Sequence, residues 1–359
     1  MTILIKVLNK DFVNIFSDYS TIKAVHLMKN DYINSNKRIG VIISNLGTPE
    51  APTRKELKRY LNQFLMDKRV IDLPRLLWVP ILKLFILNIR PKKSSKLYRA
   101  IWTDEGSPLM VFSKSIIDKL SNVIEDRITI ALGMRYGSPS IEDAMNILQK
   151  EKISKILVLP LYPQSGSPTT SSTFDAIADY LKNIPWMPDL RFISGYHDRN
   201  DYINALVRSI NNSFNKHGKP EKLIFSFHGM PYRYLEKGDP YYCFCQKSAR
   251  LTAEKLNLND NSYEVAFQSR FGSDKWLEPY IDELLINEAN NGTKHIQIIS
   301  PGFAVDCLET LEEISIQYRK LFLNNGGEKF EYIPCLNDSN DQINIIKSII
   351  DDSTKDWQK

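Results

Sequence analysis

The chain has 359 residues, of which 43% are hydrophobic and 25% charged, a composition typical of a globular protein with one or two buried cores. The formal net charge is only +5 and no stripe of Lys and Arg is evident, so we expect no nucleic-acid partner. Four cysteines are too few for a disulfide framework in a chain of this length, which favours a reducing, cytoplasmic location.

Residues 1–37 are predicted to be an N-terminal extension. Their apolar run at residues 3–8 is interrupted by Lys6 and is not followed by a small-residue cleavage site, so we find no secretory signal. Patterned sequence begins only near Arg38, with Met28 just upstream, so we expect the preceding residues to be either a frayed extension or the result of a misassigned start.

Two motifs occur twice in the same order. An apolar run at 39–44 leads into Ser-x-x-Gly-x-Pro at 44–49, and a second run at 223–227 leads into the same motif at 226–231. Ala-x-x-x-Arg-aromatic-Gly-Ser follows at 131–138 and again at 266–273. We infer an internal repeat, with convergent strand–turn chemistry as the alternative.

Both halves alternate short apolar strands with helical patterns, an order typical of parallel βαβ units. Strands are predicted at 155–160 and 295–300, and helices at 141–151, 175–182 and 276–288. We therefore predict an α/β protein of two similar Rossmann-like domains. The expected boundaries are 38–170 and 171–337, with a C-terminal helix at 338–359 completing the first domain.

The two motifs lie farther apart in the first half than in the second, which places an insertion at about residues 65–110. Prolines and charges interrupt its apolar segment at 70–87 too often for a bilayer span. Either a helix pair packs here on its own core, or an exposed apolar lip borders a ligand mouth or a membrane surface. Five cations favour the lip: Arg75, Lys83, Arg90, Lys92 and Lys93.

His228 comes at the end of a predicted strand, where ligands bind in open parallel sheets. Its counterpart in the repeat is Leu46. One domain would then offer a base or metal ligand and the other an apolar surface, as a large flat substrate requires. A hydrogen-bonded structural histidine is the alternative.

Asp306, Glu309 and Glu313 follow the strand at 295–300 with spacings of three and four, so on an α-helix they would share one face. These carboxylates either favour the helix dipole or handle cations and protons in the crevice. His228 and Glu309 follow strands of the same half and can meet as a loose metal site, to which Fe(II) is suited.

Cys243 and Cys245 form a Cys-x-Cys pair that is only a weak signal for a zinc or iron–sulfur site, because no second close pair accompanies it. A dinucleotide fingerprint or phosphate loop is also missing from the sequence.

Several of these segments together resemble the ferrochelatase family, in the family's order, from about residue 39 to 337. The motifs are NLGTP at 45–49, VIDLP at 70–74, EGSPL at 105–109, MRYG at 134–137, LPLYPQ at 159–164, SFHG at 226–229, GDPY at 238–241, PGF at 301–303 and DCLETL at 306–311.

The resemblance implies two four-stranded parallel domains of the chelatase fold with a porphyrin in the cleft between them. It also implies a lyase that inserts Fe(II) into protoporphyrin IX and releases two protons to give protohaem, the last step of haem biosynthesis. Weak peripheral contact with the inner face of a membrane through about residues 70–90 is expected, as is a monomer or weak dimer.

By the same resemblance, His228 matches the catalytic histidine and Glu309 the metal-handling glutamate. Arg135 and Tyr136 would line the metal side of the pocket, and Leu46 would touch the opposite face of the porphyrin. Asp306 and Glu313 would relay protons or metal.

The sequence departs from the family at 165–169, where SGSPT replaces an aromatic residue followed by Ser or Ala. Ser167 occupies the place of a cluster cysteine, and the chain ends at Lys359 without a cysteine-rich tail. We expect no [2Fe-2S] cluster and no other prosthetic group, because Fe(II) is a substrate.

Three alternatives stay open at this point. A sister chelatase would act on coproporphyrin, or on a substrate such as cobalt and sirohydrochlorin. A two-domain tetrapyrrole- or solute-binding protein would bind its ligand without changing it. A haem-storing or haem-sensing protein would retain the product.

Overall fold

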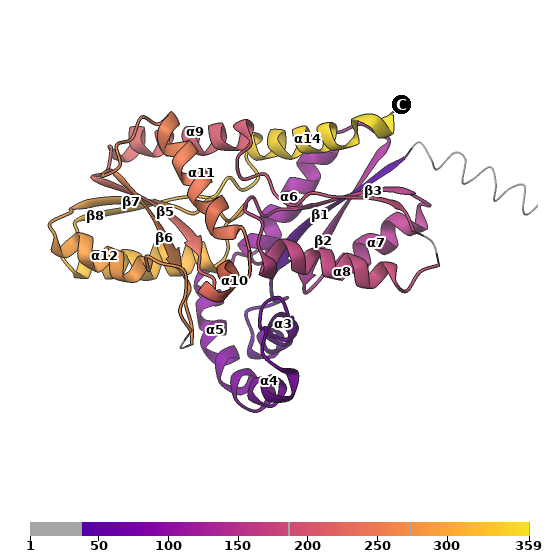
Figure 1. Ribbon diagram of the computed structural model, residues 1–359, viewed down its shortest axis with the longest axis horizontal. Coiled ribbons are helices and arrows are strands. Elements are labelled where there is room, and N and C mark those ends of the chain that lie inside the picture. The colour runs from indigo at the N-terminus through magenta and orange to yellow at the C-terminus, as the bar shows by residue number, and fades with distance from the viewer. Residues whose placement is uncertain (1–37, 186, 273, 359) are drawn as a thin grey trace, which may run out of the picture.

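The computed structural model describes residues 38–185, 187–272 and 274–358, so the predicted extension at 1–37 lies outside the described residues. Two four-stranded parallel sheets form the frame, which confirms the predicted fold class (Figure 1). The strand orders are β2-β1-β3-β4 and β6-β5-β7-β8. The same order in both halves supports the internal repeat.

The first sheet consists of β1 (Ile39–Gly47), β2 (Ile128–Tyr136), β3 (Lys155–Pro160) and β4 (Asp189–Phe192). Its helices are α6 (Pro108–Ser121), α7 (Ile141–Lys150) and α8 (Ser172–Leu181), the last preceded by a short π-helix, η2 (Ser167–Ser171). Because β4 pairs with β3, the first sheet extends past the predicted boundary at residue 170. β4 has only four residues, and they are of mixed polarity, so the sequence did not predict this strand.

The second sheet consists of β5 (Lys222–His228), β6 (Tyr263–Gln268), β7 (His295–Ile299) and β8 (Lys329–Ile333). Its helices are α9 (Asn200–His217), α10 (Tyr232–Glu236), α11 (Tyr241–Lys255), α12 (Ile281–Asn290), the π-helix η3 (Glu309–Tyr318) and α13 (Arg319–Asn324). α12 begins five residues later than predicted, because Glu278 precedes Pro279 and is disfavoured in helical conformation.

One apolar core runs through both halves. Ile39, Val41, Ile42 and Ile43 of β1 are completely buried, since helices cover both faces of a parallel sheet. In Figure 1, α9 and α14 (Asn340–Thr354) lie over one face of the two sheets, and α7, α8 and α12 lie over the other. The shared core makes the two sheets one rigid frame for any cleft between them.

The C-terminal helix α14 packs against α6 and β3 of the first unit and also against α9. Beyond it, a 3₁₀ turn, η4 (Lys355–Gln358), is bound to β4: Arg191 pairs with Asp356, and the Trp357 indole N–H donates to Asp189 at 2.7 Å. The C-terminus thus closes the outer edge of the first sheet.

The insertion forms a lobe that projects below the sheets in Figure 1. It contains α3 (Arg54–Met66), α4 (Arg75–Ile81), the π-helix η1 (Leu82–Ile86) and α5 (Leu87–Ile101). Its small core consists of Leu65, Ile71, Trp78, Leu82 and Leu87.

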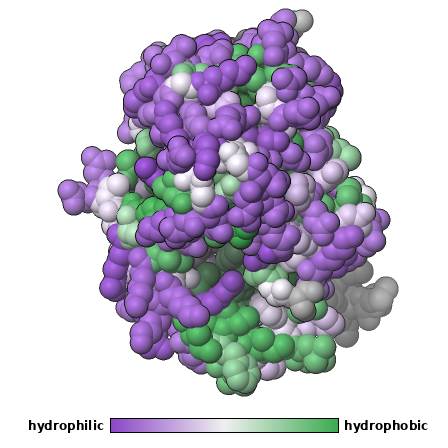
Figure 2. All heavy atoms as spheres, turned by 90° about the vertical axis from the view of Figure 1, so that its left-hand side faces the viewer, coloured by the Kyte–Doolittle hydropathy of each residue, from purple (hydrophilic) through white to green (hydrophobic). Residues whose placement is uncertain are grey.

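The outer surface of this lobe is apolar, and Figure 2 shows it as the green patch at the bottom of the molecule. We call its exposed apolar residues the lip: Leu73, Leu76, Leu77, Ile81, Leu84, Phe85 and Ile89. Leu76 is 92% exposed. The lobe therefore has both an internal core and an exposed apolar edge. No helix within the described ranges is long and apolar enough to cross a bilayer.

Candidate active site

A cleft of about 840 Å³ lies between the two sheets and the lobe. The carboxyl ends of β1 and β5, the lobe helices and η3 supply its walls. Its position agrees with the rule that ligands bind beyond the carboxyl ends of parallel strands, and its volume is at the large end for small-molecule sites. Leu46, His228, Glu309 and Glu313 all line it, so the cleft unites four of the seven predicted site residues.

His228 is the last residue of β5 and is half-buried. Its Nδ1 lies 2.7 Å from the carbonyl oxygen of Gly229. A carbonyl only accepts hydrogen bonds, so Nδ1 is the donor in this contact, and in the tautomer of the neutral ring that satisfies it Nε2 has the lone pair. The turn after His228 requires glycine at position 229, because a Cβ there would lie 2.7 Å from the Gln268 carbonyl oxygen.

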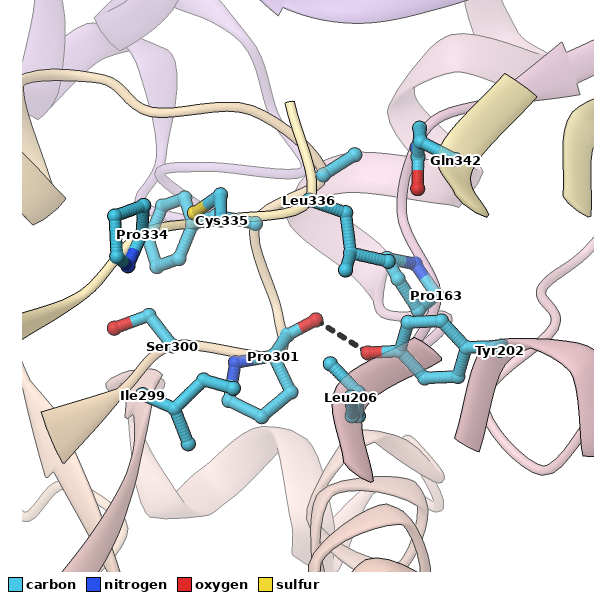
Figure 3. Close-up of a pocket in the computed structure, with 12 residues that line it drawn as sticks. Pro163, Tyr202, Leu206, Ile299, Ser300, Pro301, Pro334, Cys335, Leu336 and Gln342 are labelled. Carbon is cyan, nitrogen blue, oxygen red and sulfur yellow. Dashed lines mark hydrogen bonds between the residues drawn. The ribbon is translucent and has the colours of Figure 1, made fainter. Parts of the chain in front are cut away.

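The loop between β7 and η3 is held by Tyr202, whose hydroxyl donates to the Pro301 carbonyl oxygen at 2.6 Å (Figure 3). The small cavity beside this bond has a volume of about 10 Å³, the lower limit for one water molecule. This cavity therefore cannot be the substrate site. The buried bond instead anchors the chain that leads to Glu309.

Glu309 begins η3, in which backbone hydrogen bonds join residues five apart. Glu309, Glu312 and Glu313 of this helix all line the cleft. Glu312 was outside the predicted set, although its spacing of three from Glu309 is one that places two side chains on the same helical face. Its buried carboxylate accepts a hydrogen bond from the Gln317 side chain.

Glu313 lies in a hydrogen-bonded pocket beside the cleft. Its carboxylate accepts hydrogen bonds from the Ser269 hydroxyl, the Tyr318 hydroxyl at 2.8 Å and Gln268 Nε2 at 3.3 Å. Burial raises the pKa of Glu313; Ser269 and Tyr318 act in the opposite direction, as does the charge of His228. Burial thus favours the protonated form of Glu313.

Asp306 precedes η3 and does not line the cleft. Its buried carboxylate accepts hydrogen bonds from the hydroxyls of Thr310 at 2.9 Å and Tyr332 at 2.6 Å, and from the Asn337 side chain at 2.7 Å. Asp306 therefore does not face the cleft together with Glu309, as the predicted stripe of carboxylates requires. Its hydrogen bonds instead hold the chain just before η3.

Arg135 and Tyr136 also lie outside the cleft lining. Arg135 pairs with Asp67 and donates from Nε to the Ser172 hydroxyl at 2.6 Å, while the Tyr136 hydroxyl donates to Asp67 at 2.8 Å. Asp67 ends α3, so these side chains at the end of β2 fasten the base of the lobe to the first sheet.

The rest of the cleft is mainly apolar, with arginines toward the second domain and the lobe. Three arginines line it: Arg90, Arg233 and Arg270. Arg233 pairs with Asp72 and Asp274, and Arg270 pairs with Asp282 and Glu283. Arg90 has no ion pair within the part of the chain that the structure describes, and its guanidinium lies 5.3 Å from the Phe271 ring centroid.

Within residues 38–358, apart from 186 and 273, no three His, Cys, Asp or Glu side chains are grouped to hold a metal ion. His228 and Glu309 thus line the cleft without completing a closed metal cage. All four cysteines are free thiols; Cys243 is exposed, and burial raises the pKa of Cys245 well above its usual value.

A family model described as Ferrochelatase matches residues 38–354. Ferrochelatases from Pseudoalteromonas atlantica and Nitrosococcus oceani are each 48% identical over 325 residues, covering 89% and 90% of this chain and 90% and 88% of their own. Ferrochelatase 2 of Shewanella oneidensis is 48% identical over 316 residues, 87% of this chain and 97% of that protein. Among solved structures, SirB from Bacillus subtilis with Fe3+ has a TM-score of 0.54 at 11% identity, covering 89% of this chain and 98% of that chain, a similarity of fold alone.

Proposed function

Because the chain belongs to the ferrochelatase family, we propose that its cleft inserts Fe(II) into protoporphyrin IX and releases two protons to give protohaem. The protein is a metal chelatase, a lyase. The observation that carries the proposal is the convergence of the His228 imidazole and the Glu309 carboxylate on one apolar cleft of about 840 Å³ that has no closed metal cage. A substrate metal must leave with the product, so an open ligand set suits transfer.

The reaction must strip a metal of water, remove two pyrrole protons and bring the metal to the ring nitrogens. Because Nδ1 of His228 donates to the Gly229 carbonyl, Nε2 is the nitrogen left to accept a pyrrole proton or to ligate the metal at the ring. Glu309 escorts the metal, and Glu313, whose pKa is raised by burial, receives protons. Fe(II) enters as substrate, and no prosthetic group takes part.

For the remaining predicted residues we propose roles that their contacts support. Leu46 supplies an apolar wall opposite His228 for one face of the macrocycle. Arg135 and Tyr136 hold the lobe through Asp67 and act on the substrate indirectly, and Asp306 supports the turn before η3.

Arg90 bears on the choice of tetrapyrrole. The cleft offers one arginine without a carboxylate partner among the described residues, and its guanidinium lies near the Phe271 ring. Such a site fits a macrocycle with few carboxylates, as in protoporphyrin, better than the four of coproporphyrin or the eight of sirohydrochlorin. Competition between protoporphyrin and coproporphyrin in the insertion assay tests this choice.

The lip supports weak peripheral contact of a cytoplasmic enzyme with the inner face of a membrane. Its exposed leucines and Phe85 lie next to Lys83, Lys92 and Lys93, a combination that suits an interface of apolar chains and anionic headgroups. The expected assembly is a monomer or weak dimer.

The direct test of the function is anaerobic mixing of purified protein with protoporphyrin and Fe(II) or Zn(II), followed by the Soret absorbance. We expect turnover by the wild type, and losses of at least about 100-fold for His228→Ala and for Glu309→Gln. His217→Gln, on α9 away from the cleft, and the exposed Glu328→Gln are the matched controls. Turnover at control level in both cleft variants would overturn the assignment.

A further inference from the structure

The backbone of His228 is held by a tyrosine that no part of the proposed reaction uses. Tyr241, near the start of α11, lines the cleft, and its hydroxyl donates to the His228 carbonyl oxygen at 3.0 Å. This bond satisfies the carbonyl at the point where β5 ends.

Two further contacts fix the same peptide. The Gly229 N–H donates to the Gln268 carbonyl oxygen at 2.7 Å, and the Gly229 carbonyl accepts from His228 Nδ1 at 2.7 Å. The ring of His228 therefore takes its orientation from the peptides on either side of Gly229. Since Tyr241 holds the first of these peptides, rotation of that peptide requires loss of the Tyr241 bond.

The first domain in turn fixes Tyr241. Asp239 accepts hydrogen bonds from the Tyr241 N–H at 2.9 Å and from the Ser167 N–H at 2.7 Å, so one carboxylate joins the start of η2 to the start of α11. A Cβ on Gly166 would lie 3.3 Å from the Tyr241 ring, which is a tight contact. The absence of a side chain at Gly166 therefore lets the loop pack closely against this ring. The unusual segment at 165–169 thus packs against Tyr241.

We infer that Tyr241 is a positioning residue, which orients the His228 imidazole so that Nε2 presents its lone pair to the substrate, and that Asp239 and the 166–167 loop set the position of Tyr241. The inference rests on the proposed role of His228. We expect Tyr241 to affect turnover and not the binding of the macrocycle, because the Tyr241 hydroxyl already donates its hydrogen bond to the His228 carbonyl oxygen.

Tyr241→Phe tests the inference, because it removes the hydroxyl and keeps the ring that packs against Gly166. We expect kcat to fall about tenfold, the loss that one hydrogen bond accounts for, with the KM for protoporphyrin within about twofold of wild type. Tyr242→Phe is the matched control: its hydroxyl has no hydrogen bond within the described chain, and its ring stacks on Phe267. It should leave both constants unchanged.

A spectroscopic measurement separates positioning from a loss of structure. Long-range ¹H–¹⁵N spectra of ¹⁵N-histidine-labelled protein should show His228 protonated at Nδ1 in wild type and in Tyr242→Phe, and averaged between tautomers in Tyr241→Phe. Wild-type kcat and an unchanged tautomer in Tyr241→Phe would overturn the inference, as would a fall in porphyrin binding that matches the fall in kcat.

His228→Ala, assayed in parallel, distinguishes the two claims. Wild-type turnover in His228→Ala would overturn the proposed function. An inactive His228→Ala together with a fully active Tyr241→Phe would overturn this inference alone.

Discussion

Asp67→Asn should destabilise the protein strongly, although Asp67 lies outside the cleft. The Asp67 side chain is 6% exposed and that of its partner Arg135 is 21% exposed. Removing one charge of a buried pair leaves the other uncompensated, which costs about 3 kcal/mol. The pair between Arg69 and Asp175 lies at the same lobe base, but its side chains are 42% and 40% exposed, so Asp175→Asn should cost less than about 1 kcal/mol.

The free energy of unfolding from urea titrations of the two variants and the wild type measures this contrast. Burial acts to raise the pKa of Asp67, but hydrogen bonds from Ser172 and the Arg69 N–H, with the charge of Arg135, hold it below its usual value. A carboxyl with a lowered pKa stabilises the fold above its unfolded pKa, and this contribution is lost as the pH falls through its folded pKa. The difference between wild type and Asp67→Asn should therefore be constant near neutral pH and shrink below about pH 4. Equal losses in Asp67→Asn and Asp175→Asn would refute the reasoning.

Three further outcomes follow from the cleft and the lip. Arg90→Gln should raise the KM for protoporphyrin about tenfold with kcat nearly unchanged, because a cation–carboxylate contact is lost; steady-state assays with varied porphyrin check this, and an unchanged KM would argue against the contact. Leu76→Ser/Leu77→Ser should reduce flotation with anionic vesicles, and flotation equal to wild type would count against the lip as a membrane contact. Gly229→Ala should lower the free energy of unfolding by about 2 kcal/mol or more, because the added Cβ would meet the Gln268 carbonyl oxygen. A midpoint of thermal unfolding equal to that of the wild type would show that the turn can shift to accommodate the Cβ.

The repeat made the fold predictable. Its strands are near-continuous apolar runs that only a sheet covered on both faces can bury, and His228 and Leu46 occupy equivalent strand ends. The lip was predictable as an apolar segment too interrupted to span a bilayer. The boundary at residue 170 missed β4, because a short edge strand is defined by its pairing with β3 and not by its own composition.

The remaining site residues depend on details that spacing does not encode. Asp306 precedes the ten-residue π-helix, and its carboxylate is bound by Thr310, Tyr332 and Asn337, partners that its spacing from Glu309 does not reveal. The direction of Arg135 at the end of β2 is set by Asp67, which is 68 residues away in the sequence. Long-range partners of this kind follow from the packed structure alone.

A double-mutant cycle on metal insertion tests most directly whether His228 and Glu309 act together in one cleft. The rate of Zn(II) insertion into protoporphyrin would be compared for wild type, His228→Ala, Glu309→Gln and the double variant. Residues that serve one step are non-additive, so the double variant should be no more than about threefold slower than the slower single variant. A double variant slowed by the product of the two single effects would show that the two residues act independently, contrary to the shared site.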